Sequence, residues 1–114
     1  MCYYLYNFSN DGLARVKKDF KKKRKELKEW AFIDKTGKEA ISNLKFLWLW
    51  DFKEGMARFV TRTGWGFIDK SGEEVIKIEN CDWIDDFYDG LARVKFSNGS
   101  MGFLNKSGVI VYST

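Results

Sequence analysis

Two motifs recur three times in this chain of 114 residues, always in the same order, and this repetition constrains the fold more than any other feature. The first motif leads from a phenylalanine through a glycine to an Ala-Arg pair, and it begins at Phe8, Phe52 and Phe87. The second reads Trp-Gly-Phe-Ile-Asp-Lys-Ser-Gly in its fullest copy and occupies residues 30–37, 65–72 and 101–108. A chain with this repetition is expected to build one structural unit three times.

The motifs have the pattern of short antiparallel strands joined by tight turns. Leu13–Val16 and Trp65–Ile68 alternate in side-chain character and are rich in aromatic and β-branched residues, which is typical of strands. Asp-Lys-Ser/Thr-Gly is typical of a hairpin turn, because Asp or Asn accepts backbone N–H bonds and Gly adopts the left-handed conformation. We therefore expect about three strands per unit, eight to ten in all, and a positive φ at Gly37, Gly72 and Gly108.

These motifs resemble the WG-repeat family (WG or KWG β-repeats), whose units read F-x-x-G-L-A-x-V and then W-G-F-I-D-K-x-G-x-x-V-I. The resemblance covers about residues 8 to 114. It implies an all-β fold, an antiparallel β-meander built from three WG-type repeats, and leaves open a curved sheet or a small barrel-like solenoid. The expected single domain is 1–114, with repeats at about 8–51, 52–86 and 87–114. The family's repeats have no catalytic residues to carry over, and the resemblance implies a binding or interaction scaffold, mostly bacterial.

Within the second motif, three positions depart from the family pattern: Ala31 replaces Gly, Met101 replaces Trp and Asn105 replaces Asp. Asn105 is informative, because Asn can make the same turn as Asp34 and Asp69 but cannot titrate. Asp34 and Asp69 are therefore expected to be turn residues and not acid–base catalysts. Phenylalanines at equivalent positions are expected in the core; they are Phe8, Phe52 and Phe87, and Phe32, Phe67 and Phe103.

Composition and spacing argue against an enzyme. The chain has no histidine, which excludes His-based general bases, Ser-His-Asp and Cys-His nucleophiles and most zinc sites. No Gly-rich phosphate loop, nucleophile elbow or metal-ligand spacing is present in the sequence. We expect no catalytic residue, no cofactor and no metal site.

The sequence also bears on location. The N-terminus has no basic region followed by a long apolar stretch, and the longest apolar run, Phe46 to Trp50, is far below the ~18 residues of a membrane helix. Cys2 and Cys81 have no CxxC spacing and are expected to be unpaired thiols in a reducing cytosol. We expect a cytoplasmic protein of a bacterial cell, encoded by the host or by a phage, without membrane contact.

The copies differ most in the spacer between the two motifs, which holds 13 residues in the first unit against 5 and 6 in the others. The insertion lies within residues 17–28, which carry a net charge of +6 in a chain whose total is +4. It joins two strands that pair in the other units, so we expect a projecting hairpin, longer than the others or tipped by a short helix. The five basic residues 21–25 must face water or an anionic partner. A contact with phosphates or an acidic protein surface and a solvated loop are both open.

Two further stretches differ between copies. Residues 79–89 carry five carboxylates and no basic side chain, a composition that could offer oxygen ligands to a metal ion. The family unit commonly has Tyr-Asp-Asp here, so a structural or solvated loop is expected. Trp48 and Trp83 are equivalent and expected to be packed. Trp50 stands where the third copy has Asp85, and is either an exposed interface residue or partly covered by residues 3–6.

The sequence favours a non-enzymatic protein-binding module that acts through the basic projecting hairpin and loop aromatics. One concrete form is a small phage- or prophage-encoded inhibitor of a bacterial defence nuclease, similar to an anti-CRISPR protein. The alternative is direct binding of nucleic acid, with the basic arm along phosphates and Trp50 or Tyr88 stacked on bases, although residues 79–89 would repel phosphates. The partner's identity and the oligomeric state stay open. The predicted partner-binding residues are Lys17, Lys18, Lys21, Lys22, Lys23, Arg24, Lys25, Lys28 and Trp50.

Overall fold

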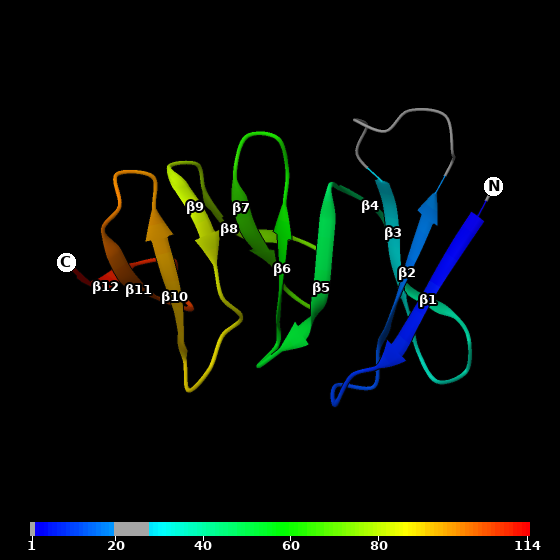
Figure 1. Cartoon of the computed structure of the whole chain (residues 1–114). Coiled ribbons are helices and arrows are strands. Elements are labelled where there is room, and N and C mark those ends of the chain that lie inside the picture. The colour runs from blue at the N-terminus through cyan, green and yellow to red at the C-terminus, as the bar shows by residue number, and fades with distance from the viewer. Residues whose placement is uncertain (1, 20–27) are drawn as a thin grey trace.

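The computed structural model describes residues 2–19 and 28–114, which form twelve β-strands in three antiparallel sheets of four strands each (Figure 1). Each sheet is a meander in which consecutive strands pair. The all-β repeat fold predicted from the sequence is confirmed, with three open sheets among the described strands in place of a closed barrel. The expected number of strands, about three per unit, was wrong by one strand per sheet.

The strand bounds follow the same plan in each sheet. The first sheet has β1 (Cys2–Phe8), β2 (Ala14–Asp19), β3 (Lys28–Ile33) and β4 (Glu39–Phe46). The second has β5 (Trp48–Lys53), β6 (Met56–Val60), β7 (Trp65–Ile68) and β8 (Glu74–Ile78). The third has β9 (Cys81–Ile84), β10 (Leu91–Phe96), β11 (Met101–Asn105) and β12 (Ile110–Ser113).

The strands that the sequence did not indicate are the first strands of the sheets, β1, β5 and β9. In β5 the pairing with β6 shifts between Leu49 and Phe52, so the two buried side chains are three residues apart. β1 carries a corresponding shift between Leu5 and Phe8. Such bulges break the alternation by which a strand is recognised in a sequence. The expectation of a loop over residues 79–89 was wrong for Cys81–Ile84, which forms β9 and pairs with β10.

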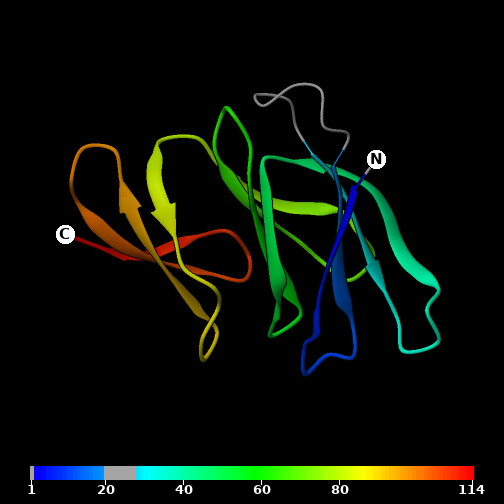
Figure 2. The ribbon, with the colours of Figure 1, turned by 45° about the vertical axis from the view of Figure 1, so that its right-hand side comes forward.

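The three sheets follow one another along the long axis of a body that measures 44 × 31 × 20 Å (Figure 2). Buried side chains form two clusters. One cluster combines residues of the first and second sheets, and the other combines residues of the second and third. The core therefore lies between neighbouring sheets, as expected for stacked repeats. The described residues include no helix that is long and apolar enough to cross a membrane.

The predicted hairpin turns are confirmed. Gly37, Gly72 and Gly108 have φ angles of +88°, +89° and +84°. In the first turn, Asp34 Oδ1 accepts hydrogen bonds from the backbone N–H groups of Thr36 and Lys38, at 2.9 and 3.1 Å. The Asn105 side-chain oxygen accepts the corresponding two bonds in the third turn, both at 3.0 Å. The role of these side chains in the turn is the same whether or not they can ionise.

Ala31 fits where the other sheets have glycine because β4 is displaced beside it. A methyl group on the equivalent Gly66 would come close to the Ile76 carbonyl oxygen and to the Phe59 ring opposite. In the first sheet, the residue opposite Ala31 is the smaller Val16. The pairing of β3 with β4 also shifts between residues 30 and 32, which passes over Ala31. The first sheet thus accepts a side chain that the second would exclude.

The expectation that all six repeated phenylalanines are core residues was wrong for two of them. Phe52 packs on Phe32 across the first junction between sheets, with ring centroids 4.6 Å apart. The equivalent rings of Phe67 and Phe87 pack across the second junction, with centroids also 4.6 Å apart. Phe8 and Phe103 belong to the two end sheets and are exposed, because no further described sheet packs against them. Burial of each ring depends on a neighbouring sheet and not on its own strand.

Candidate functional site

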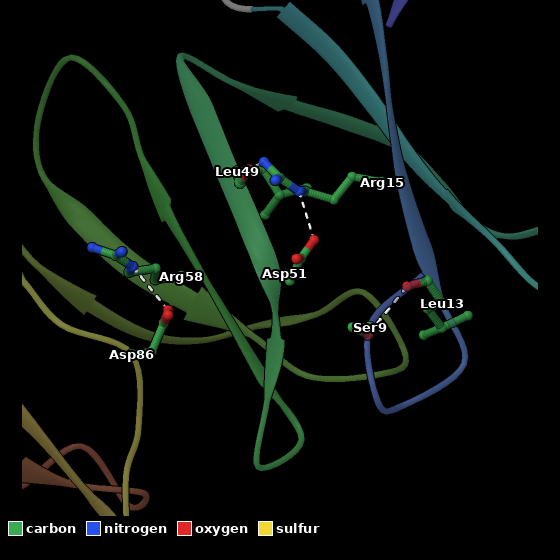
Figure 3. Close-up of polar contacts among 7 residues, drawn as sticks. All are labelled: Ser9, Leu13, Arg15, Leu49, Asp51, Arg58 and Asp86. Carbon is green, nitrogen blue, oxygen red and sulfur yellow. Dashed lines mark hydrogen bonds and ion pairs between the residues drawn. The ribbon is translucent and has the colours of Figure 1, made fainter. Parts of the chain in front are cut away.

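An arginine on the second strand of the first sheet connects that sheet to the next (Figure 3). Arg15 donates from Nε to Asp51 Oδ1 at 2.7 Å and from Nη1 to the Leu49 carbonyl oxygen at 2.8 Å. Its guanidinium lies over the Tyr6 ring, 4.0 Å from the centroid. The carboxylate matches the charge and the ring covers one flat side, an arrangement that arginine allows and lysine does not.

The second junction repeats this arrangement. Arg58 on β6 donates from Nε to Asp86 Oδ1 at 2.8 Å and from Nη1 to the Ile84 carbonyl oxygen at 2.7 Å. Two indole rings accompany it, with centroids 4.1 Å (Trp50) and 5.6 Å (Trp83) from the guanidinium carbon. We call the two groups of stacked side chains the seams: the first consists of Tyr4, Tyr6, Arg15, Lys17, Trp30 and Trp48, and the second of Trp50, Arg58, Trp65 and Trp83.

Trp50, the one predicted binding residue outside the basic segment, is a half-buried member of the second seam. Its ring stacks on Trp65, with centroids 5.5 Å apart and an interplanar angle of 23°. Arg58 lies on it as well. Tyr6, which the sequence offered as a possible cover for Trp50, instead stacks on Trp30 at 6.3 Å. Trp50 is therefore held by its own sheet, with part of its surface accessible.

The basic residues nearest the insertion's ends lie on paired strands. Lys17 Nζ is 4.5 Å from the Tyr4 ring centroid and 4.7 Å from that of Trp48. Lys18 Nζ pairs with Glu29 at 3.7 Å and also with a β4 carboxylate at 3.1 Å. The predicted pairing of the strands that flank the insertion is confirmed, with Lys18 opposite Glu29. Lys28 begins β3, and Lys21, Lys22, Lys23, Arg24 and Lys25 lie outside the described residues.

Two carboxylates of the acidic stretch 79–89 pair with arginines of the protein. Asp86 binds Arg58 across the second junction, and Asp85 pairs with Arg93 at 3.3 Å. Within residues 2–19 and 28–114, no three Asp, Glu or Cys side chains gather as a metal ion would require. Cys81 is a free, buried thiol, and burial raises its pKa to about 11, so the reactive thiolate is scarce at neutral pH.

Apart from the fully buried Trp30, the seams present indole, phenol and guanidinium groups and the Lys17 ammonium at the surface. Trp48, Trp50 and Trp65 are half-buried and Trp83 is exposed, so ring faces and edges remain available to a partner. Trp50 was predicted from the sequence as a binding residue, whereas Arg15 and Arg58 were not. Their signal is the Ala-Arg pair that recurs in every copy of the first motif.

Comparison with known families finds one that matches most of the chain. A family model described as WG containing repeat matches residues 2–21, 30–62 and 65–99. These segments together cover more than three quarters of the 114 residues and include strands of all three sheets. No curated protein matches the chain.

Proposed function

The chain belongs to the WG containing repeat family, and we propose that it is a non-enzymatic protein-binding module whose contact surface is formed by the two seams. The observation that carries this proposal is the stack of Trp50 and Trp83 around Arg58. Tryptophan and arginine are the side chains whose truncation most often weakens protein interfaces. Here both kinds are fixed before any partner arrives, which reduces the entropy lost on binding.

The ion pairs of the seams favour a protein partner over nucleic acid. Arg15 and Arg58 each bind a carboxylate at 2.7 and 2.8 Å, so neither guanidinium is available as a bare phosphate ligand. The accessible indole rings suit apolar and aromatic side chains of a protein, with the ring N–H groups ready to bond backbone carbonyls.

The basic segment 17–28, with its net charge of +6, would give a partner with an acidic surface a faster encounter. Lys17 connects this segment to the first seam through its contact with Trp48. The narrower prediction, an inhibitor of a bacterial defence nuclease, stays a prediction, as does the alternative of direct nucleic-acid binding.

The proposal is tested by affinity capture with wild-type protein and the variant Trp83→Ala, in lysate of the cells that express the chain. Trp83 is exposed, so its loss should leave the fold intact, which circular dichroism checks. Tyr88→Ala is the matched control, because Tyr88 is an exposed ring outside the seams. We expect proteins that are captured by wild type and by the control, are lost with Trp83→Ala, and persist after nuclease treatment. Equal capture by all three chains, or capture that disappears with nuclease, would contradict the proposal.

A further inference from the structure

Each junction between sheets consists of two complementary halves. The arginine half, on the preceding sheet, supplies the arginine, a phenylalanine of the second motif and a β-branched residue on the fourth strand. The aspartate half, on the first strand of the following sheet and just after it, supplies a carbonyl oxygen, a carboxylate and the phenylalanine that packs on the first one. In the first junction these are Arg15, Phe32 and Ile41, against Leu49, Asp51 and Phe52; in the second they are Arg58, Phe67 and Ile76, against Ile84, Asp86 and Phe87.

The third sheet carries an arginine half that is open to solvent. Its members are Arg93, Phe103 and Tyr112 by their place in the repeat, with Tyr112 where the junctions have isoleucine. The Arg93 side chain is 55% exposed, whereas the two junction arginines are 13% and 11% exposed. Phe103 and Tyr112 are 38% and 62% exposed, whereas their equivalents in the junctions are 0% and 6%. Asp85 pairs with Arg93 at 3.3 Å. It occupies the position in the repeat at which Tyr6 and Trp50 contact the other two arginines.

The first strand of the chain carries an aspartate half that is open as well. Leu5, Asn7 and Phe8 in β1 correspond to Leu-x-Asp-Phe at residues 49–52. β1 also has the register of β5, since Leu5 pairs with Val16 and the bulge follows before Phe8. Leu5 is 73% exposed and Phe8 is 45% exposed. Their junction equivalents are almost completely buried.

Each junction also contains an ion pair between a turn lysine and an acidic residue, and the two end sheets each carry one exposed member of such a pair. In the second junction, the turn lysine Lys106 pairs with Glu54 at 3.3 Å. In the first, Lys70 pairs with Asp11 at 3.6 Å. The corresponding acidic residue of the third sheet is Asp89, and the corresponding lysine of the first sheet is Lys35, which the repeat places at opposite ends of the body. Both are exposed.

We propose that copies of this chain associate head to tail, with β1 of one copy seated on the arginine half of the third sheet of the next copy. The contact reproduces the internal junctions and adds a further seam at each step. It joins two different surfaces, so it extends into a chain or a ring of copies and does not stop at a symmetric dimer. Asn7 offers Arg93 a neutral acceptor where the junctions offer a carboxylate, which makes the contact weaker than the internal ones and reversible. The inference does not depend on the proposed binding function.

Two variants that each block one end provide the sharpest test. Leu5→Glu places a charge in the aspartate half, and Phe103→Glu places one in the arginine half. Sedimentation velocity should show that wild type gains mass with concentration through species beyond the dimer, whereas each variant alone is monomeric. A mixture of the two variants should form a 1:1 complex and nothing larger, because one intact half remains on each. Tyr88→Glu, which changes neither half, should behave as wild type.

A gain of affinity provides an independent readout. Asn7→Asp restores the carboxylate of the internal junctions and should lower the concentration of half-association about tenfold at low salt, with the gain shrinking as salt is added. If Phe103→Glu fails to fold by circular dichroism, Tyr112→Glu replaces it in the mixing experiment. Wild type that stays monomeric up to about 1 mM would overturn the proposal, since even weak contacts associate at that concentration. Blocked variants that still associate alone, or that do not associate when mixed, would overturn it equally.

Discussion

At the scale of single residues, ionised carboxylates stabilise the turns at Asp34 and Asp69. The Thr36 and Ser71 hydroxyl groups are the largest cause of the lowered pKa of Asp34 and Asp69 in the folded chain, and backbone N–H groups add to it. Because the folded pKa lies below the unfolded value, the stabilisation is present at neutral pH. It is lost as the pH falls below the unfolded value of about 3.8 and through the folded pKa.

The third turn suggests the variant that tests this dependence. Asp69→Asn should keep the turn, as Asn105 does, and should reduce the loss of melting temperature between pH 7 and about pH 3. Asn105→Asp is the converse control and should increase that loss. Thermal unfolding followed by circular dichroism at both pH values measures the effect. An unchanged pH dependence in Asp69→Asn would show that this carboxylate does not contribute.

The turn glycines should differ in how they tolerate substitution. Gly37→Ala and Gly72→Ala both place a side chain at positive φ, which costs about 1 kcal/mol. A Cβ at Gly72 would also lie 2.8 Å from Ile41 Cγ2 of the preceding sheet, whereas one at Gly37 meets nothing within 4 Å. We therefore expect a larger loss in the free energy of unfolding for Gly72→Ala than for Gly37→Ala. Urea denaturation of both variants measures the difference, and equal losses would mean that Ile41 moves aside without cost.

At the scale of elements, the junction arginines should contribute to stability far more than the equivalent arginine of the third sheet. Arg58→Ala leaves Asp86 and the Ile84 carbonyl oxygen without their donor in a largely buried place, which should lower the free energy of unfolding by about 2–3 kcal/mol. Arg93→Ala removes an exposed pair and should cost less than about 1 kcal/mol. Urea denaturation below the concentration of association compares the two. Similar losses would indicate that the junction pair is as weak as a surface pair.

The strands differ in how clearly their sequences alternate between buried and exposed residues. Strands that alternate regularly, such as Met56–Val60 with every second residue buried, were visible in the sequence. The first strands of the sheets were missed because a bulge interrupts their alternation, as in β5, where the buried Leu49 and Phe52 are three positions apart. The corresponding bulge in β1 follows Leu5. The carbonyl and carboxylate that receive the junction arginines lie on or directly after these strands. Because these strands were not recognised in the sequence, the acceptors of the junction arginines were not recognised either.

At the scale of the whole molecule, we expect the backbone amides of the central sheet to be better protected from exchange than those of the end sheets. The second sheet contributes to both buried clusters, whereas each end sheet contributes to one. In a stack of repeats, stability is the sum of units and their interfaces, so the ends open first. We expect the amides of β6 and β7 to exchange with solvent more slowly than those of β12, all four residues of which are exposed. Hydrogen exchange at low protein concentration measures this, and equal protection throughout would indicate a single cooperative unit.

The sequence by itself determined the number of units, their order and their hairpin turns, because turn chemistry acts between residues two to four positions apart. Asp34, Asp69 and Asn105 specify their turns without reference to the rest of the fold. The tertiary structure decided which of the equivalent side chains are buried and which arginines connect sheets. Phe52 and Phe103 belong to the same set of repeated phenylalanines, yet only Phe52 meets a neighbouring sheet. Burial is a property of the space that another sheet fills, and a local pattern does not contain that information.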